Sequence, residues 1–320
     1  LVPIDFLFYL LKHERRNLVA QGNGSVFTNL KTDILKNHQV SVPPLTEQKA
    51  IAHILGTLDD KIELNQKMNQ TLEEIAKAIF KSWFVDFDPV RAKAEGRPTG
   101  LPPEISDLFP DKLVDSEIGA IPKGWDRKRV ETFADALLGG TPSRKKSNYW
   151  GGDIPWINSG AVNEFRIIEP SEYITQEGHD KSSTKLLPAK TTVIAITGAT
   201  LGQVSYLEID SCANQSVVGV IPHDNRAHEW IYLTFNAQID RLIDRQTGGA
   251  QQHINKNDVL DFDVVYPTEA LIASFSEVDQ DCLYQDTARH QGIYTKGKLP
   301  PFPIKTFKRT NDIGHFTDVD

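Results

Sequence analysis

The residues best suited to chemistry form a short basic loop, Arg144-Lys145-Lys146, between Pro142 and the aromatic pair Tyr149-Trp150. Cationic side chains beside aromatic rings can hold phosphates while neighbouring residues reach the edges of bases. The same composition also suits an ordinary solvated surface loop. The segment is therefore a candidate for contact with a nucleic acid, with a plain loop as the alternative.

A second candidate loop follows Gly248-Gly249 and runs from Gln251 to Lys256 with the sequence QQHINK. Amide side chains can make paired hydrogen bonds to adenine, and lysine can reach phosphate or guanine. The alternative is loop polarity ahead of a short helix. A third segment, 197–200 (TGAT), lies between two predicted strands and would let a ligand approach the backbone closely, although a hairpin turn is its commoner meaning.

Signatures of catalysis are missing from the sequence. It holds no Gly-x-x-x-x-Gly-Lys-Ser/Thr phosphate loop, no Gly-x-Gly cradle after a strand, and no Asn or Asp before Pro-Pro-aromatic. His223 and His228, beside Asp224 and Glu229, fit surface histidines at a strand-to-helix junction better than metal ligands. We therefore predict no catalytic residue and no metal site.

Composition and charge limit the classes of protein that fit. The 320 residues are 39% hydrophobic and 24% charged, which is typical of a soluble globular protein and leaves room for two domains. The net charge of −8 argues against indiscriminate binding to nucleic acid, so a DNA-binding face would have to be local. No apolar run approaches the ~18 residues of a membrane span, and no membrane partner is expected.

Cysteine usage and the first residues bear on cellular context. Cys212 and Cys282 are too few for a disulfide framework or a four-thiolate zinc site, so a reducing, cytoplasmic location is expected. Cys212 is interpreted as a small buried residue. The start, Leu-Val-Pro-Ile-Asp, has no initiator methionine and no signal-peptide layout, which we interpret as a fragment of a longer chain.

A long helix must position these loops. Alternate steps of four and three residues from Ile51 meet apolar side chains at almost every position, a heptad pattern that predicts a helix from about 45 to 86, ~60 Å long. Such a helix needs a helical partner. Asn65 and Asn69 interrupt its seam, either as a loose polar layer or as amides that fix the register. The predicted partner seam consists of Ile51, Leu55, Leu58, Ile62, Asn65, Asn69, Leu72, Ile79 and Trp83.

The remaining pattern predicts the α+β class, a globular domain plus a long coiled-coil-type helix. Proline, glycine and acidic residues over 89–118 indicate a linker. Residues 119–267 then contain helical periodicity at 128–138 and 228–245. Short β-branched or aromatic segments bounded by turn residues predict strands at 153–158, 192–197, 202–207, 216–221 and 263–266.

An internal repeat relates the two ends of this arrangement. Residues 22–42 and 248–266 share glycines, an Asn, a matching step (Asp33-Ile34-Leu35 and Asp258-Val259-Leu260), an alternating strand and a following proline. A Thr-Glu pair then opens a helical run in both. Two copies of a domain, each followed by a long helix, imply a protein with internal pseudo-twofold symmetry.

Several segments in this order resemble the specificity subunit of type I restriction-modification systems. They are 43–52 (PPLTEQKAIA), 55–65 (LGTLDDKIELN), 79–90 (IFKSWFVDFDPV), 116–125 (SEIGAIPKGW), 139–142 (GGTP) and 153–157 (DIPWI). The resemblance implies two target-recognition domains separated by antiparallel conserved helices. Each domain would read half of a split DNA sequence, while separate methyltransferase and restriction subunits would bring the chemistry together with S-adenosylmethionine, ATP and Mg.

The resemblance implies a partial chain with the following organisation. Residues 1–44 would end a first recognition domain, 45–88 would form the central conserved helix, 89–118 the linker and 119–267 the second recognition domain. Residues 268–320 would begin a second conserved helix, but the heptad spacing stops after Ser276, which motivates the hypothesis of a shifted reading frame near Val278. A genuine family variant with a short folded tail is the alternative.

The predicted function is therefore sequence-specific recognition of double-stranded DNA by a non-catalytic subunit that holds no cofactor. Its expected partners are methyltransferase and restriction subunits, or another copy of the chain on the helix seam. The candidate DNA-contacting residues are Thr141, Ser143, Arg144, Lys145, Lys146, Tyr149, Thr197, Thr200, Gln251, Gln252, Asn255 and Lys256.

Two other classes fit the residues alone. One is a coiled-coil scaffold or adaptor without nucleic-acid binding, and the weaker one is an enzyme with an unrecognised site. Residues 119–267 contain fifteen Lys and Arg and eighteen Asp and Glu, so their net charge does not decide between DNA binding and these alternatives. The DNA hypothesis requires a basic, polar face on 119–267, whereas the scaffold hypothesis predicts an acidic or apolar one.

Overall fold

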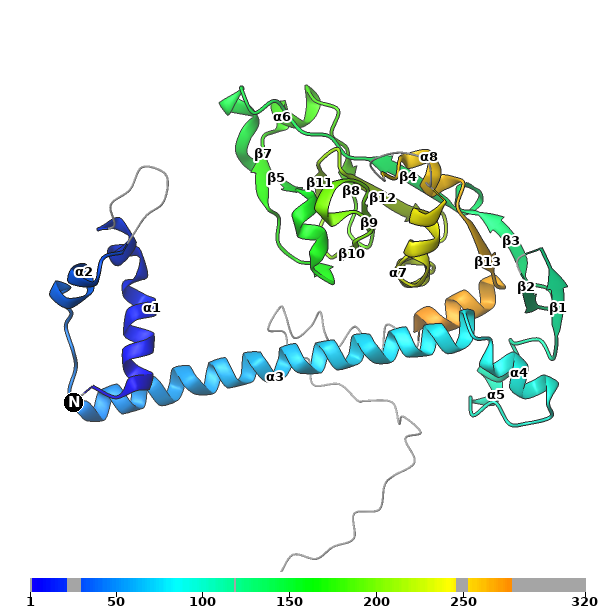
Figure 1. Cartoon of the computed structure of the whole chain (residues 1–320), viewed down its shortest axis with the longest axis horizontal. Helices are drawn as coiled ribbons and strands as arrows, with labels where there is room; N and C mark the ends of the chain where they lie inside the picture. The colour runs from blue at the N-terminus through cyan, green and yellow to red at the C-terminus, as the bar shows by residue number, and fades with distance from the viewer. Residues whose placement is uncertain (1, 22–29, 118, 246–252, 278–320) are drawn as a thin grey trace, which may run out of the picture.

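The computed structural model describes residues 2–21, 30–117, 119–245 and 253–277, and the molecule is elongated (Figure 1). Helix α3 (Leu45–Phe84) forms its long axis. Helices α1 (Ile4–Ala20) and α2 (Thr32–Asn37) lie at the start of α3, while α4 (Asp88–Ala94) and α5 (Pro103–Ser106) lie beyond its end. A domain of mixed helices and strands sits over the second half of α3.

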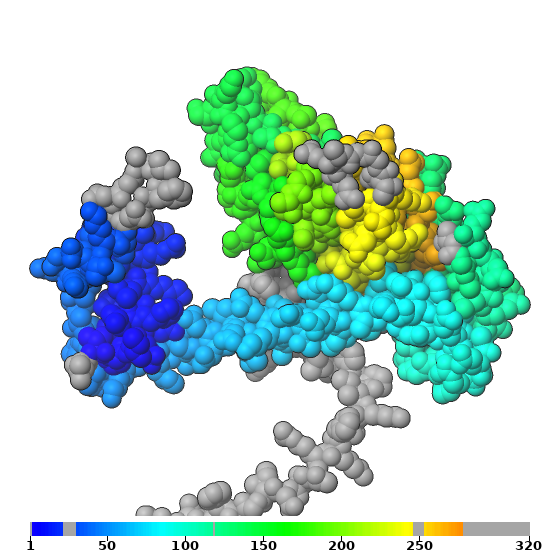
Figure 2. Space-filling model, viewed as in Figure 1, coloured from blue at the N-terminus to red at the C-terminus, as the bar shows by residue number. Residues whose placement is uncertain are grey.

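The predicted long helix is confirmed as α3, with 40 residues and a length of ~60 Å. Pro44 precedes it with an extended backbone, and Glu47 in the first turn and Lys81 in the last turn complement the helix dipole. The helix ends at Phe84, and the backbone of Phe87, directly before α4, lies in the left-handed region with φ 57°. In the space-filling view the first half of α3 stands clear of the mixed domain (Figure 2).

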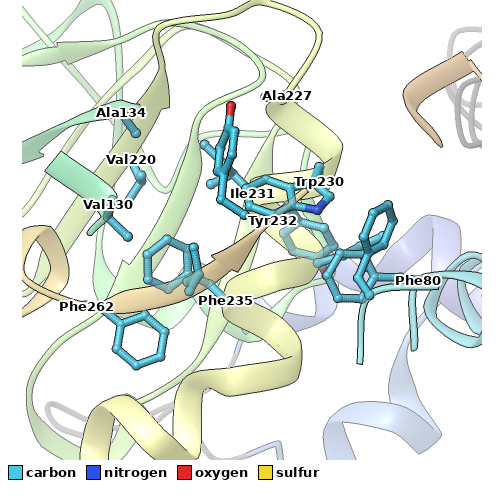
Figure 3. Close-up of a cluster of buried hydrophobic side chains, with 14 of the residues drawn as sticks. Phe80, Val130, Ala134, Val220, Ala227, Trp230, Ile231, Tyr232, Phe235 and Phe262 are labelled. Carbon is cyan, nitrogen blue, oxygen red and sulfur yellow. The ribbon is translucent and has the colours of Figure 1, made fainter. Parts of the chain in front are cut away.

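An aromatic cluster joins the end of α3 to the mixed domain. The ring of Phe84 lies 5.9 Å from that of Trp125, 6.4 Å from that of Trp230 and 5.2 Å from that of Phe275 (centroid to centroid). Phe80 and Trp83 complete the contact surface of α3, and Figure 3 draws Phe80 beside the buried side chains of the domain. Burial of these rings makes α3 and the domain one hydrophobic core.

Residues 89–117, the described part of the expected linker 89–118, pack against this core. Val90 and Phe109 are buried within it, and the ring of Phe109 meets that of Trp83 edge-on at 5.3 Å. The Nζ of Lys93 donates to the carbonyl oxygen of Phe109 at 2.8 Å. The prolines begin short helices rather than keeping the segment open, because Pro89 and Pro103 occupy first-turn positions where no N–H is needed.

Within its described residues, the mixed domain contains two larger sheets and two antiparallel strand pairs. The five-stranded sheet has the order β4 (Ala134–Leu138), β12 (Val217–Pro222), β9 (Thr192–Ala195), β10 (Val204–Leu207) and β6 (Arg166–Ile167). The four-stranded sheet has the order β7 (Glu172–Ile174), β5 (Trp150–Ile157), β11 (Ser211–Ala213) and β8 (Leu186–Leu187). The pairs are β1 (Leu113–Ser116) with β2 (Gly119–Pro122), and β3 (Asp126–Arg129) with β13 (Asp263–Tyr266).

Helices cover these sheets. The helix predicted at 228–245 is α7 (His228–Asp244), which packs on β9, β10 and β12 and lies between that sheet and α3 (Figure 1). The short helices α6 (Gln176–Asp180) and α8 (Lys256–Leu260) lie on the side of the domain away from α3. Residues 269–277 are helical and bring Phe275 to the end of α3. Within the described residues, no helix combines the length and apolarity that crossing a membrane requires.

The predicted strands are confirmed in β5, β9, β10, β12 and β13, but the helix predicted at 128–138 is wrong. That segment contains the end of β3, a 3-10 turn at Val130–Thr132 and the whole of β4. Ala134 and Ala136 are buried and Asp135 between them is exposed, the alternation of a strand. Pairing of β4 with β12 decided the outcome, because tertiary contacts override a short local periodicity.

His228, expected at the surface, is buried and supplies a pH-dependent contribution to stability. Burial lowers its pKa, while its Nδ1–H donates to the carbonyl oxygen of Lys190 at 2.7 Å. Since the folded state favours the neutral ring, the unfolded chain gains a proton first as the pH falls below about 6.5. We expect the stability contributed by neutral His228 to be fully present above that pH and to be lost as the pH falls, measured by urea unfolding.

The control for this prediction is His228→Asn, whose amide can donate to the same carbonyl oxygen but does not titrate. Its free energy of unfolding should decline less between about pH 7 and 5 than that of the unmodified chain. The same decline in both proteins would contradict the assignment to His228.

Cys212, in β11, is buried as predicted.

Candidate nucleic-acid interface

Three predicted loops meet around the turn at residues 214–216, which joins β11 to β12. The backbone N–H of Ile196 donates to the carbonyl oxygen of Ser216 at 2.9 Å, and that of Ile254 donates to the carbonyl oxygen of Ile196 at 3.0 Å. From the other side, the Thr141 hydroxyl donates to Oε1 of Gln215 at 2.5 Å. These contacts bring the three loops to one side of the domain, and we call the surface that they form there the loop surface. It consists of Thr141, Thr197, Thr200, Gln215, Asn255 and Lys256.

Gly139 and Gly140 allow the chain to enter the loop surface. A Cβ at Gly139 would lie 2.1 Å from the carbonyl oxygen of Asn214, and one at Gly140 would lie 2.6 Å from the backbone nitrogen of Thr184. The N–H of Gly140 also donates to the carbonyl oxygen of Ala213 at 2.7 Å. Only a residue without a side chain permits this approach, so the glycines hold Thr141 next to the turn.

The basic loop at 144–146 lies beside the four-stranded sheet, and its charges are engaged unequally. Both terminal nitrogens of Arg144 donate to the Glu172 carboxylate at 2.6 Å, and the guanidinium stacks 3.5 Å from the centre of the Trp150 ring. The hydrogen bonds raise the pKa of Arg144 and lower that of Glu172. Among the described residues Lys145 is exposed without a hydrogen-bond or ion-pair partner, so its amine can reach a ligand.

Lys146 and Tyr149 are placed differently from the expectation of an open aromatic loop. Tyr149 is buried, so its ring supports the fold rather than offering a stacking surface. The Nζ of Lys146 donates to the Tyr149 hydroxyl at 2.8 Å. Ser143 is exposed, and its carbonyl oxygen accepts from the ring N–H of Trp150 at 3.4 Å. Of this group, Ser143 and Lys145 remain directed to solvent.

The Asn255 side chain is engaged in helix capping. Its Oδ1 accepts from the N–H of Asn257 at 2.8 Å and that of Asp258 at 3.2 Å, and Asp258 accepts the N–H of Asn255 in return. This capping box fixes the start of α8 and presents exposed Lys256 in its first turn. Thr200 donates to the carbonyl oxygen of Thr197 at 3.5 Å within the 3-10 turn Gly198–Thr200. Gln251 and Gln252 lie outside the described residues.

Four arginines that sequence reasoning missed gather at the other end of α8. This arginine cluster consists of Arg127, Arg129, Arg241 and Arg245. Arg127 and Arg245 both donate to Oδ2 of Asp263, at 2.6 and 2.8 Å, and Arg129 reaches Asp261, which directly follows α8, at 3.3 Å. Arg127, Arg129 and Asp263 line a shallow pocket with Lys128 and Thr132.

Aromatic and electrostatic contacts hold the arginine cluster in place. The guanidinium carbons of Arg241 and Arg245 lie 5.6 and 5.3 Å from the centre of the Phe262 ring. Burial by itself raises the pKa of Asp263, but hydrogen bonds from Arg127 and Arg245 outweigh it and hold that pKa below its ordinary value. Burial and the nearby charge of Arg245 lower the pKa of Arg241.

Local spacing gave a partial signal for the arginine cluster. Arg127 and Arg129 share one face of β3 at i, i+2, and Arg241 and Arg245 share one face of α7 at i, i+4. Nothing in the sequence places these two pairs together. The cluster and the loop surface lie at opposite ends of α8, so α8 connects a cationic patch with a polar one.

The helix seam is divided by the structure. Trp83 is buried and Ile79 packs against the core, whereas Leu55, Asn65, Asn69 and Leu72 are half-buried. Ile51, Leu58 and Ile62 are 38%, 52% and 54% exposed. The last turns of α3 therefore hold the mixed domain, while the earlier part of the seam stays open. Among the described residues, no group of three or more His, Cys, Asp or Glu side chains is arranged to hold a metal ion.

Comparison with known sequences identifies relatives along most of the chain. A family model described as the type I restriction modification DNA specificity domain matches residues 3–74 and 122–275. The type I restriction enzyme HindI specificity subunit of Haemophilus influenzae is 30% identical over 85% of this chain and 70% of its own length. The MjaIX specificity subunit of Methanocaldococcus jannaschii is 25% identical over 87% of this chain and 62% of its own length.

A solved structure shares the fold. The type I restriction-modification system S subunit from M. genitalium aligns with a TM-score of 0.52 at 15% identity. The alignment covers 90% of this chain and 69% of that one. The chain therefore spans about two thirds of the proteins to which it is similar.

Proposed function

Since the chain belongs to the type I restriction-modification DNA specificity family, we propose that residues 119–267 read one half of a split DNA sequence through the loop surface. Specificity subunits of this family recognise particular DNA sequences and carry no catalytic activity of their own. The observation that supports the proposal is the hydrogen bond between Thr141 and Gln215, together with the backbone hydrogen bonds that join Ile196 and Ile254 to the same turn. Family membership does not favour the scaffold alternative.

The division of contacts follows from the chemistry of the two patches. Phosphate contacts fix the orientation of a protein on the duplex, whereas side chains at base edges select sequence. We assign Lys145 and the arginine cluster to phosphates, and the polar loop surface to bases. The face is polar, but its charge is balanced rather than basic as the DNA hypothesis expected, because Glu172 and Asp263 hold three of its arginines. A balanced charge limits indiscriminate binding to nucleic acid by a chain of net charge −8.

The exposed part of the helix seam is proposed to bind methyltransferase subunits, with restriction subunits joining that complex. The open apolar side chains of Ile51, Leu58 and Ile62 support a helical partner there, and a second copy of the chain is the alternative partner. S-adenosylmethionine, ATP and Mg would be held by the partner subunits. We further propose a cytoplasmic location, where such a complex would meet DNA.

The proposed function can be tested by selection from a pool of randomised duplex DNA with the full chain. We expect enrichment of a defined half-site, with a second, spaced half-site if another copy of the chain or another recognition domain takes part. Enrichment of no motif at about 0.15 M salt would contradict the proposal, because sequence-specific binders exceed their own non-specific affinity by at least about 10³.

Phosphate contact by Lys145 and Arg241 predicts a change in salt dependence. Lys145→Ala and Arg241→Ala should each weaken binding to all sequences about equally and reduce the slope of log K against log salt by about 1. The measurement is a titration by fluorescence anisotropy at several salt concentrations. Lys112→Ala, at an exposed lysine beside β1, is the matched control and should leave the slope unchanged. An altered selected motif with an unaltered slope would contradict the assignment.

A further inference from the structure

Gln215 is the exposed residue of a turn that the core of the domain holds in place. It lies at the tip of the turn between β11 and β12, two strands that are almost entirely buried. The N–H of Asn214 donates to the carbonyl oxygen of Ile157 at 3.0 Å, and the N–H of Val217 donates to that of Asn214 at 3.1 Å. The Asn214 side chain accepts from the N–H of Ser216 at 3.0 Å. The turn is thus held by the core of the domain.

The exposed side chain of Gln215 has a defined orientation. Its polar contact among the described residues is the hydrogen bond in which the Thr141 hydroxyl donates to Oε1 at 2.5 Å. Because Oε1 accepts the hydrogen bond from Thr141, the amide Nε2 points away from Thr141 and toward solvent. Oε1 keeps a second lone pair, and neither Nε2 hydrogen has a partner in the part of the chain that the structure describes. The side chain therefore offers one acceptor and one donor next to each other.

The position of Thr141 is itself fixed, which makes this orientation persistent. Gly139 and Gly140 bring the preceding backbone against Ala213 and Asn214, the residues that lead into the same turn. Both partners of the Thr141–Gln215 hydrogen bond are thus anchored to one rigid framework. A side chain that is oriented before binding loses less conformational freedom when it meets a base.

We propose that Gln215 is a specificity-determining residue that reads an adenine in the major groove, with Thr141 as its positioning residue. Adenine presents an N6 amino donor and an N7 acceptor there, the pattern that a glutamine amide matches with one hydrogen bond from each atom. Oε1 accepts from N6 through its second lone pair while Nε2 donates to N7. Ser216, Ile196 and Ile254 link this residue by backbone hydrogen bonds to the other loops, so it stands at their centre. This inference rests on the proposed function.

The test is selection from randomised duplex DNA with the full chain and three variants, followed by affinity measurements on the selected motif. In Gln215→Ala we expect one adenine position to accept any base, and affinity for the original motif to fall about 5- to 150-fold. Thr141→Val keeps the shape but removes the hydroxyl, so the same position should become degenerate with the rest of the motif intact. Thr141→Ser, which restores a hydroxyl, should recover the adenine preference.

The outcomes separate this inference from the proposed function. An unmodified chain that selects a motif, together with a Gln215→Ala variant that selects the same motif at the same strength, would overturn the role of Gln215 and leave the proposed function standing. Weaker binding to all sequences by an equal factor would likewise overturn it, since that result describes a phosphate or structural contact. If the unmodified chain selects no motif, both fail. Matching thermal unfolding curves of the four proteins exclude misfolding as the cause.

Discussion

Phe84→Ala is expected to lower the free energy of unfolding by about 3–5 kcal/mol, the range observed when a buried aromatic ring is truncated. Phe84 is 5% exposed and its ring meets those of Trp125, Trp230 and Phe275. These rings come from three separate parts of the chain, so their contact with α3 connects the long helix to the mixed domain. Urea unfolding followed by tryptophan fluorescence measures the loss directly.

A neighbouring position provides the control for Phe84→Ala. Val85 is 40% exposed and lies outside the aromatic cluster, so Val85→Ala should change the free energy of unfolding by no more than about 0.5 kcal/mol. Proteolysis should also cut the Phe84→Ala variant first near the end of α3. Equal stability of the two variants would show that the aromatic cluster does not hold α3 to the domain.

An insertion into α3 is expected to move the two ends of the molecule apart by a fixed distance. Four residues inserted after Asn65 lengthen the helix by ~6 Å, because an α-helix rises ~1.5 Å per residue. The site suits an insertion, since residues 61–64 and 66–68 are exposed and the contacts of α1 and of the mixed domain lie on either side. Spin labels at Lys12 in α1 and at Lys145 would report the change by pulsed electron resonance.

The same insertion makes a prediction about DNA. In a protein with two recognition domains the spacer of the split motif should lengthen by close to two base-pair steps, while both half-sites stay the same. A seven-residue insertion provides the comparison, because it lengthens α3 by ~10.5 Å and turns the far end by only ~20°. Label distances that fail to increase with insertion length, or half-sites that change with it, would refute the role of α3 as a spacer.

Local patterns in the sequence were enough to predict the long helix and most strands. The heptad spacing from Ile51 to Trp83 specifies α3, because only a helix places residues at steps of four and three on one face. Burial on both faces makes β9 and β12 continuous apolar segments, which turn residues delimit. The order of the family-like segments likewise indicated the class of protein, which the family comparison confirms.

The same local patterns failed where distant partners decide the conformation. Residues 134–138 form β4 because they pair with β12, and residues 89–117 pack because the aromatic end of α3 offers an apolar surface. Neither partner is visible within the segment itself. Proline and glycine correctly marked turns in 89–118, but turns occur in packed segments as well as in linkers.

The sequence by itself therefore determined most of the elements, the family and the identity of candidate loops, whereas only the tertiary structure decided which side chains share a surface. Thr141, Gln215 and Ile254 are far apart in the chain and meet because strand order brings their loops to one end of the sheets. The arginine cluster forms for the same reason, around a single Asp263 carboxylate. Element type follows from the period of nearby residues, but proximity of loops follows from pairing across the whole fold, and no local period encodes that pairing.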